Sequence, residues 1–349
     1  MPSEQPKPYL KLGLMVLFLL FLALFSALIF PRPKGEVKSL ISPEFFKAIN
    51  LTSTFSFASK SEGLSNIVGK NLEGKQGEYA VYIEDLNDGE NYSLRSSDSF
   101  PAASLYKLYL MAAVLKEIEN KQSLKSGDFG ELKMENKVVR KKSDLVEEFG
   151  SVDFGYEDID DGEIIEYTIE EALTRVGRIS DNFASLMLAR KIGWDNIQEV
   201  ADELGSKNTV IKSPITTTAE DIGDFFKKLY KKEVVSPFVS EKVIEFLSLN
   251  QLNNRIPAGL SDGVKVVHKT GELAGVRHDA GIVCFQTVTS GVDEETPEVR
   301  CTPGVNDTPG VNAHAYVIVL MSKDLKYEDE GVETLAKISK DVYEYFKEK

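Results

Sequence analysis

Three short motifs place two serines and two lysines in an order that suits acyl transfer. They are Ser104-Leu105-Tyr106-Lys107, Ser180-Asp181-Asn182 and Lys269-Thr270-Gly271. A serine hydroxyl is a poor nucleophile at neutral pH, so it needs a nearby base, a proton path to the leaving group and donors that stabilise the developing oxyanion. The residue types in the three motifs supply these groups, and the sequence therefore predicts an acyl-transfer site.

The first motif opens a predicted helix. Its apolar residues recur at spacings of three and four, which is typical of a buried helix: Leu105, Leu108, Met111, Ala112, Leu115 and Ile118. Residues i and i+3 lie one turn apart on the same helix face, so Lys107 can reach the Ser104 hydroxyl. Burial and a second cation lower the pKa of a lysine, and Lys269 is the natural second cation. Lys107 is therefore the predicted base.

Each of the other two motifs also has an ordinary structural explanation. Ser180-Asp181-Asn182 follows a helix that Thr168 and Glu171 are expected to cap and precedes another helix, so a tight turn with an N-cap serine is the alternative. Lys269-Thr270-Gly271 ends the β-rich run 264–268, where the alternative is a plain turn and the glycine would let a substrate approach the backbone. The ordered conjunction of all three motifs favours the catalytic interpretation.

The set resembles the signature of class A β-lactamases and penicillin-binding proteins. The similarity covers roughly residues 60 to 349, because residues 78–83 and 100–104 resemble the family's first hairpin and nucleophile helix, and 268–283 its penultimate hairpin. The resemblance implies that Ser104 is acylated, that Lys107 accepts its proton, and that Ser180 relays a proton to the leaving nitrogen.

The resemblance also implies the substrate-binding residues. Asn182 would touch Lys107 and the amide side chain of the substrate, while Lys269 and Thr270 would hold the substrate carboxylate beside Ser180. The oxyanion hole would consist of the backbone amides of Ser104 and Glu272. The complete expected substrate-binding set is Asn182, Thr270, Gly271, Glu272 and Arg277, the last as a further carboxylate ligand. Asp181 is expected to form structural hydrogen bonds.

One interval departs from the class A pattern. In class A β-lactamases a glutamate in the loop before a Thr-Thr-rich helix start activates the deacylating water, but residues 204–215 contain no carboxylate. Glu220 and Asp221 follow, and Thr218 with Asp221 predicts a helix cap. Acylation is therefore expected, whereas efficient hydrolysis of β-lactams is in doubt.

The amino-terminal region predicts a membrane anchor. Residues 12–30 form an uncharged run of 19 residues, which as a helix would span roughly 28 Å. A cleaved signal peptide is the alternative, although this run is longer than the usual apolar core. Residues 1–11 would then be a short tail and 31–58 a linker. The family's cell-wall substrates place the catalytic domain on the extracytoplasmic side of a single-pass membrane protein.

Residues 59–349 are expected to form the hydrolase domain. Strands are predicted at about 79–85, 264–271, 279–286 and 314–322, with a helical middle and a final amphipathic helix. The expected fold class is α/β (α+β), an antiparallel sheet flanked by helices with an inserted all-helical lobe. This is the β-lactamase/DD-peptidase fold that the resemblance implies.

Composition limits the partners. The formal charge of −14 argues against nucleic acid, which needs a clustered basic face. The acidic stretch 153–163 does not match an EF-hand, the three histidines are scattered, and the two cysteines lack metal-ligand spacing, so neither metal nor cofactor is predicted. Cys284 and Cys301 either form a disulfide or stay free.

The sequence thus predicts a membrane-anchored serine hydrolase that is acylated at Ser104 by a β-lactam or a D-Ala-D-Ala-like amide. Two alternatives remain. A DD-carboxypeptidase or transpeptidase acting on peptidoglycan stem peptides has the same three motifs and needs no deacylating glutamate in the loop. A sensor that is acylated once and signals through the anchor belongs to a different class, and its cytoplasmic tail would be very short.

Overall fold

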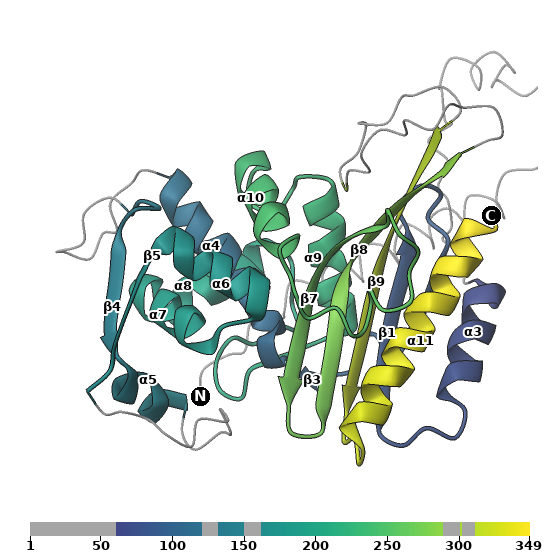
Figure 1. The fold of residues 1–349 in the computed structure, drawn as a ribbon, viewed down its shortest axis with the longest axis horizontal. Coiled ribbons are helices and arrows are strands. Elements are labelled where there is room, and N and C mark those ends of the chain that lie inside the picture. Colours follow the sequence, from purple (N-terminus) through teal and green to yellow (C-terminus); the bar gives the residue numbers. More distant parts are fainter. Residues whose placement is uncertain (1–60, 121–131, 150–161, 289–300, 302–310) are drawn as a thin grey trace, which may run out of the picture. The chain divides into compact units, whose positions relative to one another are not determined.

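A five-stranded antiparallel sheet is the base of the fold (Figure 1). The strand order is β2, β1, β9, β8, β7, so the strand that carries Lys269 lies at an edge of the sheet. In register, Lys269 lies opposite Ala280, which in turn lies opposite Val319. The strands are β1 (Glu78–Asp85), β2 (Asn91–Leu94), β7 (Lys265–Leu273), β8 (Val276–Val288) and β9 (Val311–Lys323).

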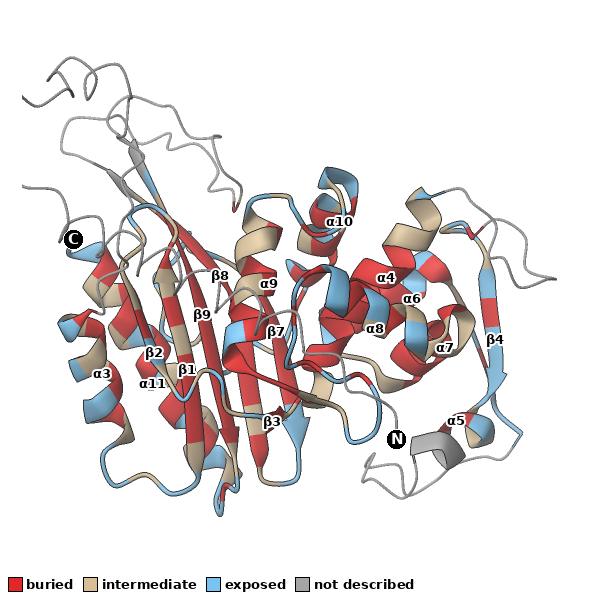
Figure 2. Ribbon diagram, turned by 180° about the vertical axis from the view of Figure 1, so that it is seen from behind, coloured by how far each residue is buried: buried red, intermediate tan, exposed pale blue. Residues whose placement is uncertain are grey.

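Both faces of the sheet are buried, which explains the continuous apolar run in β9. Successive strand side chains point to opposite faces, and Val317 packs into one core whereas Ile318 packs into the other. Helices α3 (Glu62–Leu72) and α11 (Glu328–Lys347) cover the face of Ile318, and α9 (Ala219–Tyr230) packs on the face of Val317. Figure 2 shows buried residues along much of the central strands, which lie between the helices of the two faces.

A helical lobe is inserted between β2 and β7. Its central helix is α4 (Lys107–Glu119), whose residues 107–115 are all buried. A helix that is apolar all round must be enclosed by others, and α7, α8 and α10 contact α4. The other helices of the lobe are α5 (Lys142–Phe149), α6 (Ile169–Ile179), α7 (Asn182–Ile192), α8 (Trp194–Glu203) and α10 (Pro237–Leu247).

Two short strand pairs complete the described elements. β3 (Phe100–Pro101) pairs with β6 (Thr216–Thr217), and β4 (Lys137–Lys141) pairs with β5 (Ile164–Thr168). The first pair joins the segment before Ser104 to the end of the carboxylate-free loop. The nucleophile and that loop are therefore fixed to one another by backbone hydrogen bonds.

The predicted fold class is confirmed, as are the four strands and the final helix. One boundary differs, since β7 continues to Leu273 and the third motif lies inside the strand instead of ending it at Gly271. The expected caps at Thr168 and Thr218 are both present. The extra residues belong to the strand because they pair with β8 as far as Leu273, which lies opposite Val276. The sequence of β7 alone does not show how far its pairing partner continues.

The cysteines form a disulfide between Cys284 of β8 and Cys301, with the Cα atoms 5.5 Å apart. Both residues are buried. This resolves the alternative that spacing left open, since pairing depends on how the chain folds back beside the strand.

This computed structural model describes residues 61–120, 132–149, 162–288, 301 and 311–349. These residues lie in one unit, Ser56–Lys349. The predicted tail, membrane span and linker, residues 1–11, 12–30 and 31–58, lie outside the described residues. Within the described ranges no helix has both the length and the apolar character needed to cross a membrane.

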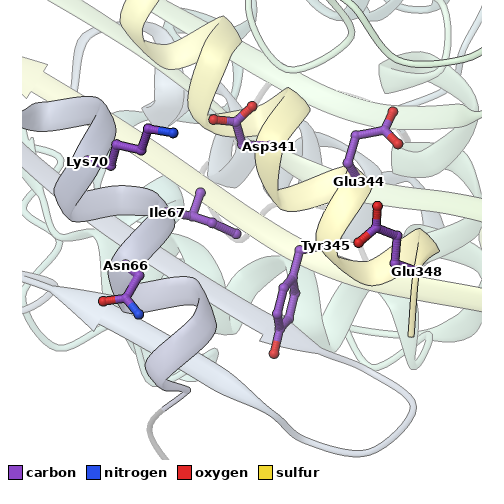
Figure 3. Close-up of a pocket in the computed structure, with 7 residues that line it drawn as sticks. All are labelled: Asn66, Ile67, Lys70, Asp341, Glu344, Tyr345 and Glu348. Carbon is purple, nitrogen blue, oxygen red and sulfur yellow. The ribbon is translucent and has the colours of Figure 1, made fainter.

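A groove separates α3 from α11 on the outer side of the sheet (Figure 3). Ile67 and Lys70 of α3 line one side, and Asp341 and Tyr345 of α11 line the other. Val267 packs into the core on the opposite face of the sheet. Lys269 points to that same face, because alternate residues of a strand point the same way. The groove therefore lies on the other side of the sheet from the Lys269 side chain.

Candidate active site

Ser104 lies in a turn of 3-10 helix, η1 (Ala103–Tyr106), that runs directly into α4. Ala103, the residue before it, has a φ of +46°, in the left-handed region that residues with a side chain rarely adopt. Such conformations persist where the surrounding structure fixes them. Gly271 of β7 packs here, since a Cβ atom at position 271 would lie 3.2 Å from that of Ala103. The glycine of the third motif thus lets β7 approach the nucleophile turn.

Lys107 is fully buried and its terminal nitrogen faces the second motif. Nζ donates to the Ser180 carbonyl oxygen at 2.6 Å and to Asn182 Oδ1 at 2.7 Å, and Ser180 Oγ lies at 3.4 Å. Burial lowers the pKa of Lys107 well below its ordinary value, and the charge of Lys269 lowers it further. A neutral amine has a lone pair that can accept a proton, which is what a general base requires.

The structure does not form the predicted contact between Lys107 and Ser104. Among the described residues, the hydrogen bonds of the Lys107 nitrogen go to Ser180 and Asn182. The two motif residues still lie one turn apart, at the start of one helix. Catalytic hydrogen bonds often tighten only when substrate binds, so this geometry is compatible with proton transfer after a change of the lysine rotamer.

Ser180 is held by the turn between α6 and α7. It has a φ of +57° and ends α6, while Asp181 caps α7 by accepting a hydrogen bond from the Ala184 amide at 2.9 Å. Asp181 also pairs with Arg175 at 2.7 Å, in line with its expected structural role. This turn directs the Ser180 hydroxyl toward the sheet, where Lys269 Nζ donates to it at 2.7 Å.

Lys269 is fully buried at the edge strand. Burial lowers the pKa of Lys269 to about 7, against the opposing effects of Asp279 and Glu272. Lys269 is therefore expected to titrate near neutral pH. Lys107, Ser180 and Lys269 form a continuous line of hydrogen-bonding groups along which a proton can move between the two lysines.

Arg255 is a residue that sequence reasoning missed. It lies between α10 and β7, is 1% exposed, and pairs with the Glu272 carboxylate. Within the described part of the chain, no partner reaches its Nε and Nη1 or the equally buried hydroxyl of Thr270. Buried donors without partners are unfavourable, and guanidinium and hydroxyl donors together suit a carboxylate. No motif marks Arg255, because it lies in an irregular segment.

Arg277 is not brought to the site. It lies opposite Glu272 on β8, but its guanidinium pairs with Glu328 at the start of α11 and donates to the carbonyl oxygens of Leu273 and Val276. The attraction of an acid in the first turn of α11 directs the side chain away from Lys269. The charge of Arg255, in contrast, acts on Lys269 and helps to lower its pKa.

The interval 204–215 supplies no acid to the site, and the acid that follows it is already engaged. Asp221 is buried, and its Oδ2 accepts from the Asn208 amide and the Thr209 hydroxyl, both at 2.8 Å. Its carboxylate thus holds the loop in place. Among the described residues, no group of three or more His, Cys, Asp or Glu side chains could hold a metal ion.

The geometry agrees with the comparisons with known proteins. The model of the beta-lactamase enzyme family matches residues 61–289. The chain belongs to the beta-lactamase enzyme family. It is therefore a serine hydrolase with the β-lactamase/DD-peptidase fold. No curated protein sequence matches the chain.

Solved structures share the fold at low identity. PBP-A is 21% identical with a TM-score of 0.65, and the match covers 83% of this chain and 98% of PBP-A. A PBP-A variant solved as an acyl-enzyme complex with penicillin G is also 21% identical, with a TM-score of 0.64 and coverage of 82% and 97%. The extended-spectrum β-lactamase TLA-1 is 22% identical with a TM-score of 0.63 and coverage of 83% and 100%. These likenesses establish the fold.

Proposed function

We propose that Ser104 is acylated by β-lactams and by D-Ala-D-Ala-like amides. The observation that carries this proposal is the buried line from Lys107 through Ser180 to Lys269, beside a serine at the start of a buried helix. Two buried lysines joined by one hydroxyl have no evident structural purpose, because burying an amine is costly. A shuttle that takes a proton from the nucleophile and returns it to the leaving group explains their burial.

The reaction follows from these positions. The Ser104 hydroxyl loses its proton to the neutral Lys107 amine as its oxygen attacks the substrate carbonyl. The backbone amides of Ser104 and Glu272 stabilise the resulting oxyanion. When the carbon–nitrogen bond breaks, Ser180 passes a proton to the leaving nitrogen and is reprotonated from the lysines. The product of this half-reaction is an acyl ester on Ser104, with every proton accounted for.

The substrate carboxylate binds at the end of this line. Thr270 and Arg255 both have buried donors free to meet it, and Lys269 supplies charge when it is protonated. The Asn182 carbonyl is bonded to Lys107, so the amide nitrogen of Asn182 is directed to the substrate. Penicillins and D-Ala-D-Ala peptides share a carboxylate close to the scissile amide, which is the geometry that this site favours.

A DD-peptidase acting on peptidoglycan stem peptides is the second candidate. The absence of a carboxylate from residues 204–215 and the engagement of Asp221 favour it over an efficient β-lactamase. Deacylation needs a general base, which typically contributes about 10² to 10⁴ in rate. With penicillin the acyl-enzyme should therefore persist, whereas a peptide substrate turns over if Lys107 serves both steps.

We also propose that residues 12–30 anchor the protein in a membrane, with the hydrolase domain on the extracytoplasmic side. Support comes from the apolar run itself and from the Cys284–Cys301 disulfide, since disulfides persist mainly in oxidising compartments. In membrane preparations, a full-length protein that resists extraction by salt and alkali would agree with an anchor. A soluble form that begins near residue 30 would instead indicate a cleaved signal.

Fluorescent penicillin tests the proposed chemistry directly. Intact-mass spectrometry should show one adduct on the wild type, rapid formation of about one equivalent and slow release. Ser104→Ala should show no adduct, and Lys107→Met should acylate orders of magnitude more slowly. Ser240→Ala is the matched control, because Ser240 is a buried serine outside the three motifs that bonds to the backbone of Val234, and it should label normally.

The outcomes separate the candidates. An adduct on Ser104→Ala would exclude Ser104 as the nucleophile. Sustained penicillin hydrolysis without a burst would establish an efficient β-lactamase and overturn the argument from the loop. A lasting adduct with turnover of a D-Ala-D-Ala peptide would identify the peptidase, and a lasting adduct with no peptide turnover would favour the sensor.

A further inference from the structure

Residues 250–256, which we name the strap, run between α10 and β7 and contact both walls of the active site. The Gln251 amide donates to the Arg178 carbonyl oxygen at 2.9 Å, close to Ser180 at the end of α6. The Asn250 side chain donates to the His268 carbonyl oxygen at 3.1 Å, next to Lys269 on β7. The strap therefore joins the second motif to the third, and it carries Arg255.

Two buried side chains of the sheet hold the strap. His268 Nδ1 donates to Asp279 Oδ1 at 2.8 Å, since a carboxylate can only accept. The other carboxylate oxygen, Oδ2, accepts from the Ile256 amide at 2.9 Å. His268 Nε2 lies 3.2 Å from Asn253 Oδ1. The hydrogen bond from the Ile256 amide fixes the strap directly after Arg255.

The pair lies on the same face of the sheet as Thr270. Asp279 is directly opposite Thr270 in the sheet, and directly opposed residues share a face. His268 is on that face too, because alternate residues of a strand point the same way. His268, Asp279, Thr270 and Arg255 are all at most 1% exposed. His268, Asp279 and Thr270 therefore share one buried face of the sheet, and Asp279 bonds to the residue that follows Arg255.

A buried histidine–carboxylate pair is not needed for stability, since apolar residues of similar volume often stabilise a protein at least as well. The pair can instead fix the position of the backbone, because hydrogen bonds are directional and restrict a backbone segment more than apolar packing does. Here they fix the Ile256 amide, next to Arg255. That explains why a polar pair occupies a fully enclosed position beside the third motif.

We infer that His268 and Asp279 are positioning residues that hold the strap so that the Arg255 guanidinium can recognise the substrate carboxylate. This inference rests on the proposed function. Neither residue touches the reacting atoms, and both act through Arg255. Their removal should weaken discrimination in favour of carboxylate-bearing substrates and leave the acylation chemistry of Ser104 intact.

The test compares acylation of the full-length protein by benzylpenicillin and by its methyl ester, which lacks the carboxylate charge. The readout is the second-order rate constant for benzylpenicillin divided by that for its methyl ester. Arg255→Ala should lower that ratio about 10-fold to 100-fold, the range expected for a hydrogen bond to a charged group. His268→Ala should lower it in the same direction, with the rate for the ester nearly unchanged.

Two further variants distinguish a positioning role of His268 from a general loss of structure. His268→Asn keeps a donor where Nδ1 lies and should restore most of the ratio. The double variant of Arg255→Ala with His268→Ala should lose no more than Arg255→Ala alone, because His268 acts through Arg255. The control is His314→Ala, which removes another histidine near a carboxylate, Asp85 at 3.3 Å, and should leave the ratio unchanged even if it lowers the melting temperature.

The inference fails if His268→Ala slows both substrates equally, or if its effect on the ratio adds fully to that of Arg255→Ala. Failure of the proposed function has a different signature, since neither substrate would then acylate wild-type Ser104. A lower ratio in His314→Ala would also overturn the inference, because it would show that any loss of stability changes discrimination.

Discussion

Acylation by a carboxylate-bearing substrate should slow as the pH rises through about 7, because Lys269 loses its proton there. Burial lowers the pKa of Lys269 to about 7, so the charged fraction falls from roughly nine-tenths at pH 6 to one-tenth at pH 8. The pKa of Lys107 also lies well below its ordinary value, because burial and the charge of Lys269 both disfavour its protonated form. The second-order acylation constant should therefore decrease about tenfold between pH 6 and pH 8.

Stopped-flow measurement of benzylpenicillin acylation across this range provides the assay. Lys269→Arg is the informative variant, because arginine stays charged throughout and should abolish the decrease even if it lowers the overall rate. The methyl ester of benzylpenicillin should show a weaker decrease than the acid. Equal constants for the wild type at pH 6 and pH 8, or the same decrease in Lys269→Arg, would refute the assignment of this titration to Lys269.

Three further outcomes are expected. Burial lowers the pKa of His278 to about 4, so its contribution to stability is complete above the ordinary value of 6.5 and is lost as the pH falls toward 4; urea unfolding should show about 3 kcal/mol of acid destabilisation that His278→Gln lacks. Thiol titration of the unreduced, denatured protein should find no free thiol from Cys284 and Cys301, and two would contradict the disulfide. Asp181→Ala should lower the free energy of unfolding by about 1 to 2 kcal/mol through loss of the α7 cap, and an unchanged urea midpoint would contradict this.

Local patterns predicted the sheet and the helix that follows Ser104 well. The β-rich run of β7 and the three-and-four spacing of α4 are visible within a few residues, and both elements formed, although β7 continues to Leu273. The helix cap at Thr168 was also predictable, because it depends only on residues within the first turn of α6. The order of Ser104, Lys107, Ser180 and Lys269 predicted one site, and the structure brings Lys107, Ser180 and Lys269 within hydrogen-bonding distance.

Contacts between residues far apart in the sequence determined the features that local patterns could not predict. Arg277 was a reasonable carboxylate ligand until α11 brought Glu328 beside it. Arg255 had no pattern of its own, because its burial depends on contacts that reach from the strap to His268 and Asp279. The disulfide was undecided for the same reason, as it requires Cys301 to return to β8.

The left-handed backbone at Ala103 has an evolutionary consequence. Glycine adopts this conformation without steric cost, so Ala103→Gly would relieve strain beside the nucleophile without removing a hydrogen bond. It would also free the turn that directs Ser104. Selection for thermal stability alone would therefore favour glycine at position 103, whereas selection for catalysis would oppose it. Directed evolution toward heat resistance is expected to produce Ala103→Gly together with slower acylation.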